Sequence, residues 1–490
     1  MKRTVFIATL ALLLCLTLVA PAFAETPDIS QQVDLVMYLI GSPAPDYDEM
    51  LEQLNAKMAV DLNATLTVNW VGWGDFGTKY PLILASGEPV DLIYASTWTN
   101  YYSEVAKGAF LPLEDLLPVY APKTYADITP DFMKQATVNG HLYGIPASFY
   151  QVGMMGYIMR GDFLAESGII ESEGVAGYGD FTIDHYGMFM DYIKNNHPEI
   201  QPGDYMATSD ALDSYFAFSQ NLYTVTVPFY IDLSADEPVV VNFYDLPDSV
   251  LLPHFNKMKE WGDKGYWSKT VLSDKEENKF RDGKAASRLH NQDSWKTTYN
   301  THPEYDAKYY FGAPYAFKTA AMQDGLAVPA AAKNPERALM LVEKLRQDEE
   351  YYDLMTYGIK GKHWELNENG ELIPLDADGF APEGYCSWGF KEIKFFKPPV
   401  GMPANLDEVN AALDDLATIN PYTLFFADYE PIKNERAAVF NVWQQYGLPL
   451  AYGYVDVESG LATVREKMAA AGAETMRAEL ERQLREFLAE

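Results

Sequence analysis

Six side chains, each in a segment expected to be a loop, combine aromatic rings or carboxylates with polar neighbours. They are Trp73, Asp75, Trp98, Asp293, Trp295 and Trp388. The flat rings of tryptophan can stack on the C–H faces of a sugar, and carboxylates can accept hydrogen bonds from its hydroxyls. For any single tryptophan, packing inside the protein explains the residue equally well. The set predicts a carbohydrate-binding cleft.

Three of these side chains follow strands of a predicted layered unit. Its expected elements are strands at 34–40, 64–71 and 90–95, with helices at 47–58 and 76–85. Alternating strands and helices indicate an α/β fold, in which ligands bind at the carboxyl ends of the strands. Trp73 and Asp75 follow the second strand, and Trp98 follows the third. We therefore expect all three at one edge of a sheet.

A second unit is expected after residue 146. Its predicted helices lie at 181–195, 211–219 and 249–261, and amphipathic helices broken near Gly472 fill 459–488. Residues 279–289 lead into a short strand, and Asp293 and Trp295 follow it. Trp388 lies where a third crossing between the units is expected.

Two short segments predict a hinge between the units. Tyr143–Ala147 and Gly325–Pro329 each place a proline beside extended apolar residues, and paired crossings of this kind can act as a hinge. The ligand would lie in the crevice between the lobes. The predicted division is lobe 1 at 25–146, with about 326–385 returning to it, and lobe 2 at 147–325, with about 386–490 returning to it.

The first 24 residues predict a secretory signal peptide. Two basic residues precede the apolar run Val5–Val19, and Ala22–Ala24 forms a cleavage signal. The apolar run is shorter than the ~20 residues that span a bilayer. Cys15 follows a leucine rather than the small residue of a lipid-anchor site, so we expect it to be discarded. Cys386 is then the one cysteine left, which excludes an internal disulfide framework.

Size and charge set further limits. The chain has 490 residues with 48% hydrophobic content, which is too long for one core and ample for two. The formal net charge is −33, which disfavours binding to nucleic acid or to anionic membranes. No stretch after the leader is long and apolar enough to span a membrane.

An enzyme is the main alternative class. A secreted glycosidase needs two carboxylates about 5–10 Å apart, and the 70 acidic residues leave such a pair open. The sequence contains no G-x-S-x-G or H-E-x-x-H motif and no phosphate-binding loop. Asp376–Gly379 begins like a calcium loop but lacks the later ligands, so it predicts a turn. We expect no catalytic residue, metal or cofactor, and a peptide ligand remains a further alternative.

Several segments together resemble a known family. Gly140–Pro146 resembles the crossover of extracellular solute-binding proteins of ABC importers. Asn334–Leu339 and Tyr357–Trp364 resemble a branch found beside oligosaccharide-type importers, and Lys467–Leu488 resembles its terminal helical segment. The resemblance implies a type II periplasmic-binding-protein fold, with two α/β lobes, three crossovers and a ligand closed between them.

The resemblance also implies a function. The expected protein is the exported substrate-binding component of an ABC importer, capturing an oligosaccharide or sugar derivative by lobe closure. Its partners would be the permease subunits, with ATP handled by other subunits. The family's lipid-anchor cysteine is missing at the mature start. We expect a monomer, periplasmic or extracellular, held at the outer face of the cytoplasmic membrane through the importer.

The cleavage site gives a first testable prediction. Mass spectrometry of the exported protein should find Glu25 as the first residue, because the cleavage signal ends at Ala24. A mature chain that starts at an acylated Cys15 would contradict this prediction and would establish a lipid anchor instead.

Overall fold

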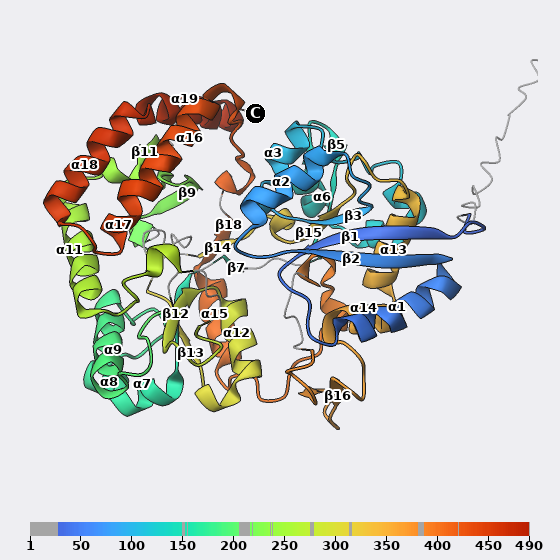
Figure 1. The fold of residues 1–490 in the computed structure, drawn as a ribbon, viewed down its shortest axis with the longest axis horizontal. Coiled ribbons are helices and arrows are strands. Elements are labelled where there is room, and N and C mark those ends of the chain that lie inside the picture. Colours follow the sequence, from blue (N-terminus) through green and yellow to red (C-terminus); the bar gives the residue numbers. More distant parts are fainter. Residues whose placement is uncertain are drawn as a thin grey trace, which may run out of the picture.

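Two α/β lobes lie side by side in the computed structural model (Figure 1), which confirms the expected fold class. The expected leader and Cys386 lie outside the described residues, as does most of the helix expected at 211–219. The structure describes residues 28–148, 152–153, 155–204, 216–217, 219–235, 237, 239–274, 279–312, 316–380, 387–419 and 421–489.

Lobe 1 is built on a five-stranded sheet in the order β2-β1-β3-β15-β6. The strands are β1 (Val33–Ile40), β2 (Ala64–Val71), β3 (Leu92–Ala95), β6 (Gly144–Pro146) and β15 (Gly325–Ala327). β1 runs parallel to β2 and β3, and β15 runs antiparallel to both β3 and β6. The three strands expected from the apolar runs are confirmed, and the carboxyl ends of β2 and β3 lie on the side facing lobe 2.

Helices with apolar stripes cover this sheet. They include α1 (Tyr47–Asp61), α2 (Phe76–Ser86), α3 (Tyr101–Ala106), α4 (Leu117–Tyr120), α5 (Pro122–Asp127), α6 (Pro130–Ala136), α13 (Pro335–Gln347) and α14 (Glu349–Tyr357). In α1 the buried side chains Met50, Leu54 and Met58 recur every four residues, so one face of the helix packs on the core. Gly87 ends α2 in the left-handed conformation, with φ 71°, which glycine adopts without strain.

Lobe 2 contains two small antiparallel sheets. β8 (Gly156–Met159) lies between β12 (Ser287–His290) and β13 (Lys308–Tyr310). β9 (Leu222–Thr226), β10 (Phe229–Asp232) and β11 (Val239–Asn242) form a meander. The helices of this part are α7 (Gly161–Ser167), α8 (Ile169–Ser172), α9 (Ile183–Asn196), α11 (Asp248–Lys264), α12 (Gln292–Thr301) and α15 (Leu406–Leu416).

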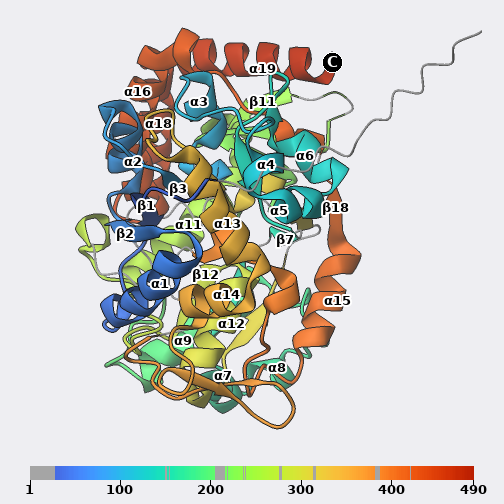
Figure 2. The same cartoon turned by 90° about the vertical axis from the view of Figure 1, so that its right-hand side faces the viewer.

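The last part of the chain forms an outer helical layer on lobe 2. Its helices are α16 (Lys433–Val442), α17 (Leu448–Ala451), α18 (Val457–Ala470) and α19 (Ala473–Ala489). The expected break is confirmed at Gly472, where φ is 84°. α19 crosses one end of the molecule in both views (Figure 1 and Figure 2).

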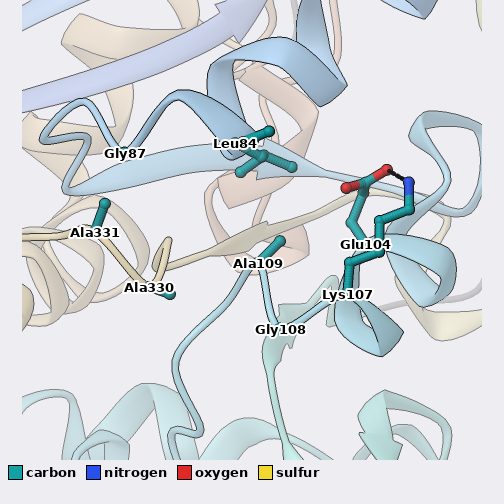
Figure 3. A pocket seen from close by; sticks show the side chains of 9 residues that line it. Leu84, Gly87, Glu104, Lys107, Gly108, Ala109, Ala330 and Ala331 are labelled. Atoms are coloured by element: carbon teal, nitrogen blue, oxygen red, sulfur yellow. Dashed lines mark hydrogen bonds and ion pairs between the residues drawn. The ribbon is translucent and has the colours of Figure 1, made fainter.

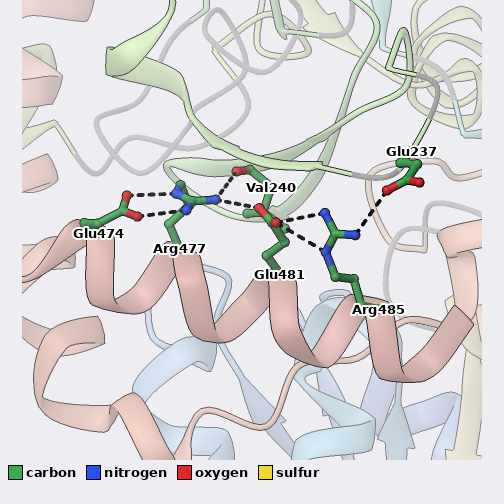
Figure 4. A network of polar contacts seen from close by, with 6 residues as sticks. All are labelled: Glu237, Val240, Glu474, Arg477, Glu481 and Arg485. Atoms are coloured by element: carbon green, nitrogen blue, oxygen red, sulfur yellow. Dashed lines mark hydrogen bonds and ion pairs between the residues drawn. The ribbon is translucent and has the colours of Figure 1, made fainter. Parts of the chain in front are cut away.

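Two arginines of α19 fasten this helix to the meander (Figure 4). Arg477 donates a 3.2 Å hydrogen bond to the Val240 carbonyl of β11 and pairs with Glu481 on its own helix. About two turns further along the helix, Arg485 pairs with Glu237 beside the same strand. These bonds add direction to a contact whose stability comes mainly from the buried apolar side of α19.

Two crossing segments run next to each other between the lobes. At the lobe 2 end, β7 (Val152–Gly153) and β18 (Ala417–Ile419) flank β14 (Ala316–Lys318) in one sheet. At the lobe 1 end, Gly325 of β15 pairs with Pro146 of β6. The Ala147 amide also donates a 3.0 Å bond to the Asp324 carbonyl. The crossings are therefore hydrogen-bonded to each other at both ends.

The third crossing comes later than the sequence suggested. Phe390 is fully buried in the lobe 1 core, and the amide of Val400 still bonds to Leu372. Gly389 allows this packing, because a Cβ there would lie 2.7 Å from the Gly325 carbonyl oxygen. We therefore place the return to lobe 2 after residue 400 rather than near 386.

A buried ion pair ties the first crossing to the lobe 1 segment that precedes the third crossing. Arg346 of α13 donates a 2.8 Å bond to the Pro146 carbonyl, and its guanidinium lies 3.5 Å from the Glu392 carboxylate. Glu392 also accepts a 2.8 Å bond from Ser148. Arg346 and Glu392 are 1% and 3% exposed. If either partner were lost, water could not solvate the charge that remained.

Loss of one partner should therefore destabilise the protein. Glu392→Gln keeps a hydrogen-bond acceptor for Ser148 but leaves the buried Arg346 charge without its ion-pair partner, so the free energy of unfolding should fall by ~3 kcal/mol in urea denaturation. Glu430→Gln is the matched control, because its partner Lys433 is exposed and its loss should leave the midpoint unchanged. Equal midpoints for both variants would contradict this account of the hinge.

Candidate ligand-binding site

Three of the predicted tryptophans meet at the edge of lobe 1. Trp73 follows β2, Trp98 follows β3, and Trp388 lies in the short helical turn Ser387–Phe390, which precedes the third crossing. The ring centroids of Trp73 and Trp98 lie 5.8 Å apart, and those of Trp73 and Trp388 lie 6.0 Å apart. All three side chains are partly exposed. We call this group the aromatic wall.

The position of Trp98 is set by the turn that holds it. Ser96 accepts a 3.3 Å bond from the Trp98 amide, and the Thr99 hydroxyl accepts a 2.9 Å bond from the Ser96 amide. Its ring packs against Tyr94 and Phe76, with centroid distances of 5.3 Å to each. The ring is therefore held in place before any ligand arrives.

The aromatic wall is also joined to the second crossing. Tyr94, beneath Trp98, donates its hydroxyl proton to the Asp324 carboxylate, and the Ser96 hydroxyl donates to the Gln323 carbonyl. Thr97 adds a 3.1 Å bond to the Gln323 side chain. A movement of this crossing would therefore shift Tyr94 and Ser96, the residues that position Trp98.

On lobe 2, polar side chains gather where β12 leads into α12. Asn291 caps α12 by accepting a 3.0 Å bond from the Ser294 amide, a typical N-cap contact. Asp293 pairs with Lys296 at 2.5 Å, and 39% of its side chain stays accessible. We call His290, Asn291, Asp293 and Lys296 the polar wall.

Electrostatics connects the two walls. Burial acts to raise the pKa of the Asp293 carboxyl, but the positive charges of Lys296 and Lys391 outweigh it and hold this pKa well below its usual range. The Lys391 amide bonds to the Trp388 carbonyl at 3.1 Å, so a residue next to the aromatic wall acts on the polar wall. The Asp293 carboxylate is ionised at neutral pH and can only accept hydrogen bonds.

His290 remains neutral under the same conditions. Burial lowers the pKa of its imidazole to about 3, and the positive charge of Arg288 acts in the same direction. Folding therefore favours the uncharged ring. As the pH falls from about 6.5, the unfolded chain takes up this proton first, so His290 makes the folded state less stable in acid.

The structure contradicts the expectation for Trp295. This side chain is fully buried in a core cluster with Phe280 and Tyr309, and its ring lies 5.6 Å from that of Tyr309. Its indole N–H donates a 2.6 Å bond to the Ala307 carbonyl. The tryptophan lies on the inward face of α12, so it packs the helix and offers no surface to a ligand.

Asp75 lies at the rim of lobe 1. It is the residue before α2, its side chain is 56% exposed, and it pairs with Lys79 one turn along the helix at 2.8 Å. Its neighbour Phe76 packs on Trp98. Asp75 is close in sequence to the aromatic wall, but its exposed side chain is already paired with Lys79.

The sequence prediction missed His290, Tyr94 and Lys391. A signal for His290 was present, because it directly precedes Asn291, a residue type that commonly caps a helix. Tyr94 lies inside an apolar strand, where pattern alone predicts packing.

Two hollows on the described surface lie away from both walls. One, of about 370 Å³, lies on lobe 1 among small side chains such as Ala109, Ala330 and Ala331, with the Glu104–Lys107 pair at its end (Figure 3). It has no aromatic ring on which a sugar could stack. The other, of about 610 Å³, is polar and surrounds Lys279 on lobe 2.

The described residues also show two plain absences. They contain no cluster of three or more histidine, cysteine, aspartate or glutamate side chains arranged to hold a metal ion. Within the same residues, no helix is both long and apolar enough to cross a bilayer.

Comparison with known proteins identifies the family. Residues 49–360 match the family described as bacterial extracellular solute-binding protein. The chain belongs to this family. Residues 421–489, which include the outer helices α16–α19, match a domain of unknown function. The solute-binding family match covers part of each lobe, from within α1 to α14, and includes the first two crossings.

Relatives and solved structures match this solute-binding protein over almost its whole length. A carbohydrate ABC transporter substrate-binding protein of Streptococcus pneumoniae is 25% identical over 487 residues, covering 95% of this chain and 93% of the relative. The N-glycan transport solute-binding protein NgtS of the same species, in complex with Man1GlcNAc, has a TM-score of 0.75 at 22% identity, covering 94% and 100% of the two chains. The S. pneumoniae substrate-binding protein FusA with kestose has a TM-score of 0.61 at 15% identity, covering 93% and 99%.

Burial distinguishes Trp295, which packs in the core, from the partly exposed tryptophans of the aromatic wall. Trp295→Ala should lower the free energy of unfolding by ~3–5 kcal/mol in urea denaturation, because it empties a packed site and leaves the Ala307 carbonyl unpaired. Trp98→Ala removes a partly exposed ring and should cost less than half as much. A Trp295→Ala variant as stable as Trp98→Ala would contradict the assignment of Trp295 to the core.

Proposed function

We propose that this solute-binding protein is the exported substrate-binding component of an ABC importer and that it captures an oligosaccharide between its two walls. The observation that carries the proposal is the grouping of Trp73, Trp98 and Trp388 at one lobe edge. Lys391, whose amide bonds to the Trp388 carbonyl, acts electrostatically on Asp293 of the other lobe. The carbohydrate named for the S. pneumoniae relative supports the same ligand class.

The two walls supply the two contacts that a sugar needs. Its C–H faces lose contact with water when they stack on indole rings, and its hydroxyls donate to a fixed carboxylate. Asp293 suits this role because its carboxylate is ionised and partly accessible. Trp73, Trp98, Trp388 and Asp293 are the proposed contacts, Asp75 is a rim contact for a longer chain, and Trp295 is left out.

Closure would follow from placing the walls on different lobes. A ligand that touches both walls binds the closed arrangement more tightly, so it shifts the lobes towards that arrangement. The bonds from Tyr94 and Ser96 to the second crossing connect the aromatic wall to the segment that must bend. We propose lobes with boundaries at 25–146 and 147–325, with the last return after residue 400.

The family and the Asp293 carboxylate both favour binding of a sugar over its hydrolysis. The family and its relatives are binding proteins of transporters. A glycosidase acid must hold a raised pKa so that it is protonated when the sugar arrives. The pKa of Asp293 is lowered, so Asp293 does not suit the role of that acid. The proposed partners are a carbohydrate and the permease subunits, for a monomer at the outer face of the cytoplasmic membrane.

Glycan titration tests this function. The purified mature protein should bind at least one of Man1GlcNAc, Man5GlcNAc, kestose and maltose in isothermal titration calorimetry. Trp73→Ala or Trp98→Ala should then weaken that binding by ~2 kcal/mol or more, because each removes a stacking surface.

Phe440→Ala is the control for this experiment. Phe440 is 45% exposed on α16 and far in sequence from both walls, so its loss should leave affinity unchanged. Full affinity in both tryptophan variants, no binding of any of the four glycans, or steady release of monosaccharide would each contradict the proposal.

A further inference from the structure

Strand β12 presents two polar side chains on the face opposite the main core cluster of lobe 2, where the paired residue Ile158 is buried in a second core cluster. Ser287 and Leu289 are buried, with Leu289 in the main core cluster of the lobe. Because successive side chains in a strand alternate between faces, Arg288 and His290 share the opposite face. Both remain partly accessible. His290 directly precedes Asn291, so this face leads into the polar wall.

The hydrogen bonds around Asn291 define the tautomer of His290. The Asn291 side-chain oxygen accepts the Ser294 amide at 3.0 Å, which fixes that atom as an acceptor. The same oxygen lies 3.1 Å from Nδ1 of His290, so Nδ1 must carry the proton and donate it. In a neutral imidazole the other nitrogen, Nε2, is then an acceptor.

That acceptor is not used within the described part of the protein. His290 makes no other side-chain hydrogen bond among the described residues, and its ring is held neutral by burial and by Arg288. Among the same residues, the Arg288 guanidinium has no hydrogen-bond or ion-pair partner, and the charges that act on its pKa are those of Asp204 and Arg281. Two neighbouring polar groups, one acceptor and one donor, are therefore left for another molecule.

Electrostatic interactions connect His290 to residues beside the aromatic wall. His290 and Asp293 interact electrostatically, and Asp293 interacts with Lys391, whose amide bonds to Trp388. A sugar stacked on the aromatic wall would thus meet the Arg288–His290 face as the lobes close.

We propose that Nε2 of His290 accepts a hydrogen bond from a sugar hydroxyl while Arg288 donates to an adjacent oxygen of the same ligand, and that this pair sets the specificity of lobe 2. The proposal rests on the proposed function. The ligand class is a neutral oligosaccharide with a free hydroxyl next to a second oxygen. A site that hydrogen-bonds a hydroxyl rejects analogues without it, because its buried polar groups are then unpaired.

Two near-isosteric variants separate this role from a structural one. In His290→Asn the amide nitrogen can replace Nδ1 towards Asn291, but nothing replaces Nε2. In His290→Gln the longer amide can place an oxygen where Nε2 was, at the cost of the Asn291 contact. Binding of whichever of Man1GlcNAc, Man5GlcNAc, kestose and maltose binds the wild type most tightly is measured for both variants, together with their melting temperatures.

The expected result is that His290→Asn weakens binding by about tenfold or more, while His290→Gln stays within about threefold of the wild type. The reverse order, or equal affinities, would overturn the proposal, because a packing role depends on the Asn291 contact alone. If His290→Asn does not fold, Arg288→Lys replaces it, and this variant should also lose about tenfold because one ammonium cannot replace the planar guanidinium.

The pH dependence gives a second readout. The charged groups that act on His290 are Arg288 and Asp293, and neither changes charge between pH 5 and 8. Wild-type affinity should therefore be constant over that range. A tenfold loss towards pH 5 that His290→Gln abolishes would contradict a neutral acceptor. Absence of all glycan binding by the wild type would instead refute the proposed function, and this proposal with it.

Discussion

The insertion of β15 between β3 and β6 is the constraint on which the two-lobed arrangement depends. This strand brings the chain back to lobe 1 after about 180 residues, and it pairs antiparallel with both neighbours. The pairing sets the second crossing beside the first. Tyr94, at the register position opposite Leu326, then reaches the crossing with its hydroxyl. Sheet, hinge and aromatic wall are therefore parts of one hydrogen-bonded unit.

The two walls differ in chemistry because different elements build them. In the aromatic wall, Trp73 and Trp98 come from the segments after two parallel strands, and Trp388 comes from the short helical turn Ser387–Phe390. The polar wall comes from a helix start, where Asn291 must remain polar to satisfy the free amides of α12. A sugar has both apolar faces and hydroxyl edges, so walls of opposite character on two lobes complement it better than two alike.

Much of lobe 1 could be predicted from the sequence because its signals are local. The alternation of strands and helices through residues 34–95 gave β1–β3, and the rule on strand ends brought Trp73 and Trp98 together. Trp295 could not be assigned in this way, since a helix places one tryptophan inward or outward according to a few degrees of rotation. The grouping of Trp388 with lobe 1 depends on Gly389 fitting against β15, a contact between distant segments that no local pattern reports.

The most direct test of this account is a crystal structure of the mature protein with its best-bound glycan. The account predicts that one sugar ring stacks on Trp73, Trp98 or Trp388 while a hydroxyl of the same glycan bonds to Asp293 of the other lobe. A glycan seated instead in the polar hollow around Lys279, or touching one lobe alone, would contradict capture between the two walls.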